Sequence, residues 1–235
     1  MNETVIVYRA SEVAAAHGSQ RLWPRHATLW LLSAPLLLVL LVPLIALVLR
    51  VSPANLLANV STPIVSQAIR LSLLTSLLTT ALTLAAGTPV AYLLARRNFW
   101  GRGALDTLID MPMVLPPSVA GIALLLAFGR RGLLGQPLSV LGWDIAFTTT
   151  AVVLAQLFVA APYFVKAATA GFISVERELE QAAALDGASV LQVFQKVTLP
   201  LAGPALFGGM VMTWARALGE FGATIIFAGN FPGRT

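Results

Sequence analysis

Five long apolar segments limit what this chain can fold into. They span about residues 28–49, 64–94, 104–128, 146–170 and 203–228. A run of about 20 apolar residues, wound as a helix, is long enough to cross the hydrocarbon core of a bilayer. Charged residues make up only 11% of the 235 residues, against roughly 25% in soluble proteins. We therefore predict an all-α integral membrane protein with five spans.

The distribution of basic residues predicts the orientation of these spans. Residues 1–27 are mixed and polar, and we expect a cytosolic N-terminal tail there, with a transmembrane domain over 28–235. Short cytosolic loops carry an excess of Lys and Arg. With the N-terminus inside, the cytosolic side holds Arg9, Arg21, Arg25, Arg96, Arg97, Arg102, Lys166, Arg177 and Lys196. The outer side then holds Arg50, Arg130, Arg131 and Arg234, with Arg70 near the outer end of the second segment, so the smaller number lies outside, as the rule requires.

Prolines interrupt the apolar segments. Gly87 and Pro89 mark the likeliest bend in the second segment, and the third is broken by Pro112, Pro116 and Pro117. Irregular backbone at membrane depth is tolerated where it is buried in protein or lines a cavity. Ser118 would stand near the N-terminus of a half-helix over 117–128, where backbone N–H groups favour anions. The break is thus either part of an anion path or a structural kink.

Ionisable residues inside the spans are the other candidates for a transport path. Arg216 and Glu220 are four residues apart in the fifth segment, which places them on one face of a helix. They either gate a path or form an internal ion pair, because charges at membrane depth avoid lipid. Asp106 and Asp110, near the inner end of the third segment, are expected to be interfacial caps or ion-pair partners.

The stretch at about 171–202, between the fourth and fifth segments, has the pattern of two short helices. With Ser174 as its N-cap, the first helix is predicted over 175–185, ending at Asp186–Gly187. The second begins near Ser189 and ends at Leu199–Pro200, with an apolar face formed by Val190, Val193, Phe194 and Val197. This stretch is either a cytosolic docking knob or a loop packed on its own bundle.

Its spacing resembles the EAA loop of ABC importer permeases. Gln181-Ala182-Ala183 is followed after three residues by Gly187, and after nine more by Val197-Thr198-Leu199-Pro200. Gln181 stands where the motif has glutamate, and Glu180 lies one place earlier. In that family the loop is the coupling helix, which sits in a cleft of the ATPase subunit. The resemblance implies coupling residues Glu180, Gln181, Ala182, Ala183, Gly187, Leu199 and Pro200.

Three further stretches, 110–117, 129–132 and 216–224, look like the molybdate/tungstate branch of these permeases. Sulfate permeases share the Arg-Ala-Leu-Gly-Glu part and are the nearest alternative. The resemblance implies a type I importer bundle in a bacterial or archaeal cell membrane. It also implies a homodimer with two ATP-binding subunits and an external oxyanion-binding protein. Members usually carry one more span after this region, so this sequence is either part of a longer chain with a sixth span or a short variant with five. The path residues would be Pro116, Pro117, Ser118, Arg216 and Glu220.

The sequence contains no G-x-x-x-x-G-K-[ST] phosphate loop, and its two histidines, His17 and His26, lie in the N-terminal tail. We therefore expect no cofactor or metal on this chain, with ATP and Mg held by the partner subunit, no enzymatic activity of its own and no nucleic-acid partner. An ion-gradient-driven transporter with Asp110 and Glu220 as coupling acids, or a scaffold without transport, remains as an alternative. Neither explains the gapped loop pattern.

Overall fold

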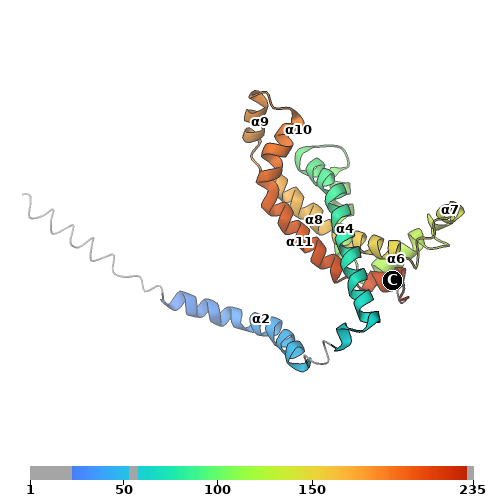
Figure 1. The fold of residues 1–235 in the computed structure, drawn as a ribbon. Helices are drawn as coiled ribbons and strands as arrows, with labels where there is room; N and C mark the ends of the chain where they lie inside the picture. Colours follow the sequence, from blue (N-terminus) through green and yellow to red (C-terminus); the bar gives the residue numbers. More distant parts are fainter. Residues whose placement is uncertain (1–22, 53–57, 232–235) are drawn as a thin grey trace, which may run out of the picture. The chain divides into compact units, whose positions relative to one another are not determined.

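The computed structural model describes residues 23–52 and 58–231, and these contain helices and no strand. The chain divides after Val60 into two compact units, which are described separately. The first unit contains α2, Trp23–Arg50 (Figure 1). This helix begins within the stretch predicted as a tail, since Pro24 is tolerated in a first helical turn. The rest of the predicted tail, residues 1–22, lies outside the described residues.

Three long helices form the centre of the second unit: α4 (Pro63–Arg96), α8 (Thr149–Ser174) and α11 (Leu199–Leu218). Each of the three packs against the other two (Figure 1). Helix α4 is unbroken through Gly87 and Pro89. A Cβ at Gly87 would lie 3.0 Å from the ring of Phe164, so this glycine allows close approach of α4 and α8.

A polar stripe of α4 is buried inside this bundle. Gln156 of α8 donates from Nε2 to Thr75 Oγ1 (3.2 Å) and accepts from Thr79 Oγ1 (3.0 Å). Trp214 Nε1 of α11 donates to Ser76 Oγ at 3.2 Å. Buried polar groups need such partners, and small polar residues let helices approach closely within a membrane. These hydrogen bonds fix the register of the three helices.

The third apolar segment forms two helices, α5 (Arg102–Val114) and α6 (Pro117–Phe128), whose axes differ by 119°. The predicted break and the first residue of the second half-helix are confirmed. Proline disfavours helical backbone in the residue before it, which ends α5 ahead of Pro116. The described residues hold four helices apolar and long enough to span, or five if this bent pair counts as one span. The short helix α7 (Gly135–Val140) follows α6.

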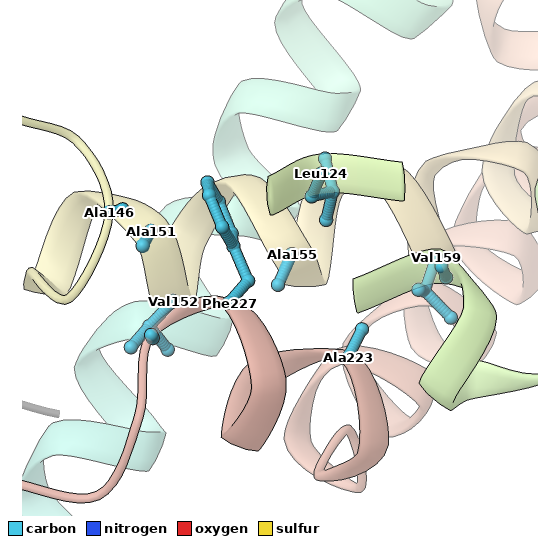
Figure 2. Close-up of a cluster of buried hydrophobic side chains, with 10 residues drawn as sticks. Leu124, Ala146, Ala151, Val152, Ala155, Val159, Ala223 and Phe227 are labelled. Carbon is cyan, nitrogen blue, oxygen red and sulfur yellow. The ribbon is translucent and has the colours of Figure 1, made fainter. Parts of the chain in front are cut away.

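The fifth segment is also broken, so the prediction of a single span to residue 228 is wrong. Helix α11 ends at Leu218, and α12 begins at Gly222 and ends at Phe227. Figure 2 shows Phe227 reaching from α12 toward Ala151 and Ala155 of α8, close to Leu124 of α6. Helices α6, α8 and α12 therefore share one apolar core at the end of the bundle opposite α9 (Figure 1).

At the other end lie α9 (Arg177–Leu185), α10 (Val190–Val193) and the π-helical turn η1 (Phe194–Thr198). The predicted N-cap Ser174 is wrong, because α8 extends through Ser174, whose Oγ donates to Gly171 O. Glu176 occupies the N-cap position of α9, and the helix starts two residues later than predicted.

The predicted end of the second short helix at Leu199–Pro200 is also wrong. Ser189 starts it with a capping box to Gln192, as its sequence suggests, but the chain then continues through η1 into α11. The Leu199 N–H donates to Phe194 O, five residues back. Pro200 lies in the first turn of α11, where a missing N–H is tolerated, and the wide π turn relieves the clash of its ring with the preceding turn.

Candidate functional site

Glu180 fastens the segment predicted as the coupling loop to the end of α4. Its Oε1 accepts from Arg96 Nη2 at 2.9 Å and from Thr198 Oγ1 at 2.6 Å. Arg96 Nη2 also donates to Val175 O at 3.0 Å. The side chains of Arg96 and Glu180 are only 8% and 17% exposed. We call Arg96, Glu180 and Thr198 the coupling clasp, because it joins α4, α9 and η1.

Three aromatic rings, one each from α4, α8 and η1, pack together near the coupling clasp. Tyr92 of α4 meets Phe172 of α8 edge-on at 5.5 Å and Phe194 of η1 at 5.1 Å, measured between ring centroids. Phe172 and Phe194 are 6.1 Å apart. Edge-to-face pairs at such distances stabilise beyond the area that they bury. The π turn is therefore anchored on the bundle by apolar as well as charged contacts.

The remaining predicted coupling residues lie mostly on the opposite, free surface. Gln181, Ala182 and Gly187 are exposed, as is Pro200, while Ala183 and Leu199 are half-buried. Gly187 has a φ of +88°, a left-handed conformation that residues with side chains rarely adopt, and the predicted end of the first short helix at Asp186–Gly187 is confirmed. The carboxylate at position 180 thus points into the bundle, and the amide at 181 faces outward.

This free surface is partly apolar and carries charges of both signs. Leu185, Val190 and Leu191 are all exposed on α9, α10 and the turn between them. Between α9 and the end of α4 is a cavity of about 270 Å³, with Arg97 and Arg177 in its wall together with the clasp residues Arg96 and Glu180. Exposed apolar groups gathered in one place are typical of a surface that another protein covers.

At the other end, Glu220 joins the broken halves of the fifth segment. Its Oε2 forms an ion pair with Arg216 Nη1 at 2.6 Å, and its Oε1 accepts from the Ala223 N–H at 2.7 Å. The Glu220 side chain is 1% exposed and that of Arg216 is 27% exposed. Glu220 lies after the last turn of α11, so the two residues do not share one helix face. The ion pair exists, but it bridges a helix end and the start of α12.

The breaks in the third and fifth segments lie side by side. A Cβ at Gly222 would lie 2.5 Å from the Cβ of Pro117, and one at Gly121 would lie 2.9 Å from Ala223 O. These glycines let α6 and α12 cross in contact. The structure therefore brings the predicted path residues of the two segments into one region. Pro116, Pro117 and Ser118 are exposed there, and Glu220 is buried behind them.

Asp106 and Asp110 are confirmed as ion-pair partners, and their partner is Lys166. The basic-residue count placed Lys166 on the cytosolic side, whereas it lies inside α8, eight residues before the helix ends at Ser174. Asp110 and Glu220, the two candidate coupling acids of a gradient-driven transporter, are thus both ion-paired. A lysine within an otherwise apolar run was a signal of this cluster that sequence analysis did not use.

The polar stripe of α4 also escaped sequence analysis. Thr75, Thr79 and Thr83 recur every four residues, as do Ser76 and Thr80, and all five are buried. Such spacing on one face of an apolar helix could have indicated a helix-packing surface.

Comparison with known proteins identifies the family. Residues 87–233 match the profile of the family described as "Binding-protein-dependent transport system inner membrane component". The chain belongs to this family. The matched region contains the coupling segment and both broken helices. This family member is thus a multi-pass membrane subunit of a transport system, and as an ABC importer permease it works with ATP-hydrolysing and substrate-binding partners.

Named relatives and a solved structure agree with this assignment. The chain is 45% identical over 193 residues to the molybdenum transport system permease protein ModB of Mycobacterium bovis, covering 82% of this chain and 73% of that protein. It is 35% identical over 199 residues to a probable sulfate transport system permease protein cysT of Helicosporidium, covering 83% and 74%.

The solved structure is a bacterial ABC transporter involved in the import of the acidic polysaccharide alginate. It matches 88% of this chain and 80% of its own chain with a TM-score of 0.66 and 20% identity. At this level of identity the likeness establishes the shared fold, and the prediction of an ABC importer transmembrane bundle is confirmed.

Proposed function

We propose that this chain is the permease subunit of an ATP-driven importer of molybdate or tungstate. The observation that carries the proposal is the 45% identity, over 193 residues, to a permease named for molybdenum transport. The stretches at 110–117, 129–132 and 216–224, which resemble the same branch, support it. The oxyanion crosses without chemical change, so the chain itself makes and breaks no bonds.

In this proposal the coupling segment transmits the ATPase cycle to the bundle. Two copies of the chain form a homodimer in a bacterial or archaeal cell membrane, and each offers α9 and α10 to one ATP-binding subunit. ATP and Mg are held by those subunits. The exposed apolar residues Leu185, Val190 and Leu191 support docking. The coupling clasp supports transmission, because it ties α9 to α4 over 84 residues of sequence.

The proposed orientation places the N-terminus and the coupling segment in the cytosol. The count of basic residues supports it, and so does the position of Arg97 and Arg177 beside α9. An external binding protein then delivers the oxyanion to the end of the bundle formed by α6 and α12.

We assign the outer part of the path to Pro116, Pro117, Ser118 and Arg216. The N-terminus of the 12-residue helix α6 presents backbone N–H groups at Ser118, which is exposed. Arg216 supplies a partly exposed positive charge. Glu220 acts here as a positioning residue, because its buried carboxylate holds the guanidinium of Arg216 and the first turn of α12.

Sulfate is the second candidate substrate, supported by the 35% identity to a probable sulfate permease. Both ions are tetrahedral dianions, so the helix N-terminus and Arg216 would serve either one. Selection between them then rests chiefly with the external binding protein.

The test is uptake into proteoliposomes that contain the chain, its ATPase subunit and its binding protein. ATP-dependent uptake of labelled molybdate that excess sulfate does not compete away is the expected result. Uptake driven by an ion gradient without ATP would overturn the proposal, and ATP-driven uptake of sulfate but not molybdate would replace the proposed substrate.

A further inference from the structure

A three-residue charged cluster joins α5 and α8 within the membrane domain. Lys166 Nζ donates to Asp106 Oδ1 and to Asp110 Oδ2, each at 2.8 Å. The side chains are 31%, 48% and 44% exposed in the order Lys166, Asp106, Asp110. These charges are therefore paired with one another and still open on one side.

Lys166 and Asp110 lie about two turns inside the helix ends nearest α9, and Asp106 lies about one turn inside. Lys166 is eight residues from the end of α8 and Asp110 is eight residues from the start of α5. At 1.5 Å per residue, each is about 12 Å along its helix. The end of α8 at Ser174 lies on the side that carries α9, because α9 follows it directly. The start of α5 at Arg102 lies on the same side, because it follows the end of α4, where Arg96 contacts α9. The cluster thus occupies the half of the membrane domain nearest the coupling segment.

A cavity of about 480 Å³ opens beside the cluster. Arg102, Asp106, Lys166 and Thr169 line it, together with the apolar or small residues Leu94, Gly103, Ala170 and Ile173. Ionised side chains at membrane depth are costly in lipid and normally face a bundle interior or a water-filled space. A cavity lined by three charged residues and a threonine fits an aqueous space better than a lipid-facing groove.

We propose that this cavity is part of the translocation path and that Lys166 is a transient binding residue for the transported oxyanion. The inference rests on the proposed transport function and adds a second binding position, nearer the coupling segment than the outer break. An ammonium group has three N–H donors, and two of them are engaged by Asp106 and Asp110. The third remains to donate to an oxyanion oxygen.

The two aspartates explain why this binding position would not trap its substrate. Lys166 with both carboxylates carries a formal charge of −1, and Arg102 on the cavity wall brings the total to zero. A dianion is thus attracted by the ammonium and repelled by the carboxylates. Conduction needs binding that is favourable enough for entry and weak enough for release. In this proposal the ammonium supplies the attraction for entry, and the carboxylates supply the repulsion for release.

Cysteine accessibility tests the position of the cavity directly, since the chain contains no cysteine. In the complete importer, Thr169→Cys is expected to react with a membrane-impermeant, negatively charged thiol reagent applied from the cytosolic side, and molybdate should slow the reaction. Leu78→Cys, on an exposed apolar face of α4, is the control and should react much more slowly. Equal reactivity of the two cysteines, or no protection by molybdate, would overturn the proposal.

Transport variants test the role of Lys166. We expect Lys166→Gln to lower ATP-driven molybdate uptake about tenfold or more, the usual scale for losing a charge-assisted hydrogen bond, and Lys166→Arg to retain most of it. The triple variant Lys166→Gln, Asp106→Asn, Asp110→Asn removes all three charges of the cluster together, so it should fold and bind the ATPase subunit yet transport as poorly as Lys166→Gln. Uptake by the triple variant at the wild-type rate would refute this binding position.

Substituting the two paired carboxylates gives a second measurement, whose result should not change if the cluster has only a structural role. Asp106→Asn with Asp110→Asn should strengthen inhibition of uptake by molybdate enclosed inside the vesicles, because repulsion no longer speeds release. Unchanged inhibition would contradict the proposal. If the wild-type chain transports no oxyanion at all, the proposed function fails. If the wild type transports and these variants match it, only the further inference fails.

Discussion

Two arginine–glutamate pairs hold opposite ends of the same helical bundle, and they do different work. Arg96 and Glu180 are 84 residues apart and connect α4 to α9 and, through Thr198, to η1. Arg216 and Glu220 are four residues apart and connect the end of α11 to the first turn of α12. The first pair binds separate helices together, whereas the second pair shapes a break within one segment.

The two pairs therefore predict different consequences when the glutamate of each is removed. Removing Glu220 leaves the partly exposed Arg216 and the buried Ala223 N–H without their acceptor, so it should affect folding. Removing Glu180 leaves Arg96 with Val175 O as an acceptor and the π turn with its aromatic contacts, so it should affect communication with the ATPase subunit more than the fold. The following experiments are ordered from the largest expected effect to the smallest.

Glu220→Ala should destabilise the protein most, by about 3–5 kcal/mol, which is typical of breaking a buried ion pair by removing one partner. The expected observation is a marked fall in the thermal unfolding temperature in detergent. Glu220→Gln keeps an acceptor for the Ala223 N–H and should lose less. Equal unfolding temperatures for Glu220→Ala and the wild type would show that the second pair does not shape the break.

Glu180→Ala should cost about 1–3 kcal/mol of stability, because Arg96 and Thr198 lose their shared acceptor. Its larger effect should be on co-purification of the ATPase subunit and on protease cleavage within 176–189, which should become faster. Glu178→Ala, in the same first turn of α9 but exposed, is the matched control and should change neither. The clasp would be refuted if both variants behaved alike.

Gly121→Ala tests the close crossing of α6 and α12. The new Cβ would lie 2.9 Å from Ala223 O and from Ile226 Cβ, so the helices must shift. The expected loss is about 1–3 kcal/mol, measured by thermal unfolding. Gly208→Ala on α11 meets no atom within 4 Å and should leave stability equal or higher, because alanine favours a helix interior. A larger loss for Gly208→Ala would contradict the geometry.

Gln156→Leu should have the smallest effect, about 1 kcal/mol or less, in line with interhelical hydrogen bonds inside membranes. Thr75 Oγ1 also donates to Leu71 O and so keeps a partner when the glutamine is lost. The unfolding temperature should fall slightly, with uptake unchanged. A fall as large as that of Glu220→Ala would mean that the buried polar stripe, and not the Arg–Glu pairs, dominates the stability of the bundle.

Sequence alone predicted the elements whose signals are local. The apolar runs located all the long helices, and the prolines located the break before Pro117. The gapped motif identified the coupling segment. Gly187 marked the end of α9, because glycine readily adopts the left-handed backbone conformation found there.

The errors arose where a tertiary contact decided the outcome. Gly219 to Phe221 looked like part of an apolar helix, and the break there depends on the Glu220 carboxylate accepting from Ala223 across the turn. Pro200 looked like a stop, but the π turn before it lets the helix continue. The partner of Glu180 could not be read from spacing, because Arg96 lies on another helix.

The most direct test of the account is a charge exchange within the coupling clasp. Arg96→Glu and Glu180→Arg should each abolish ATP-driven molybdate uptake and weaken binding of the ATPase subunit, because each places two like charges together. The double variant, with the charges exchanged, should recover a substantial part of both. Recovery would show that this ion pair transmits the ATPase cycle to the bundle. Normal uptake by either single variant, or no recovery in the double variant, would contradict it.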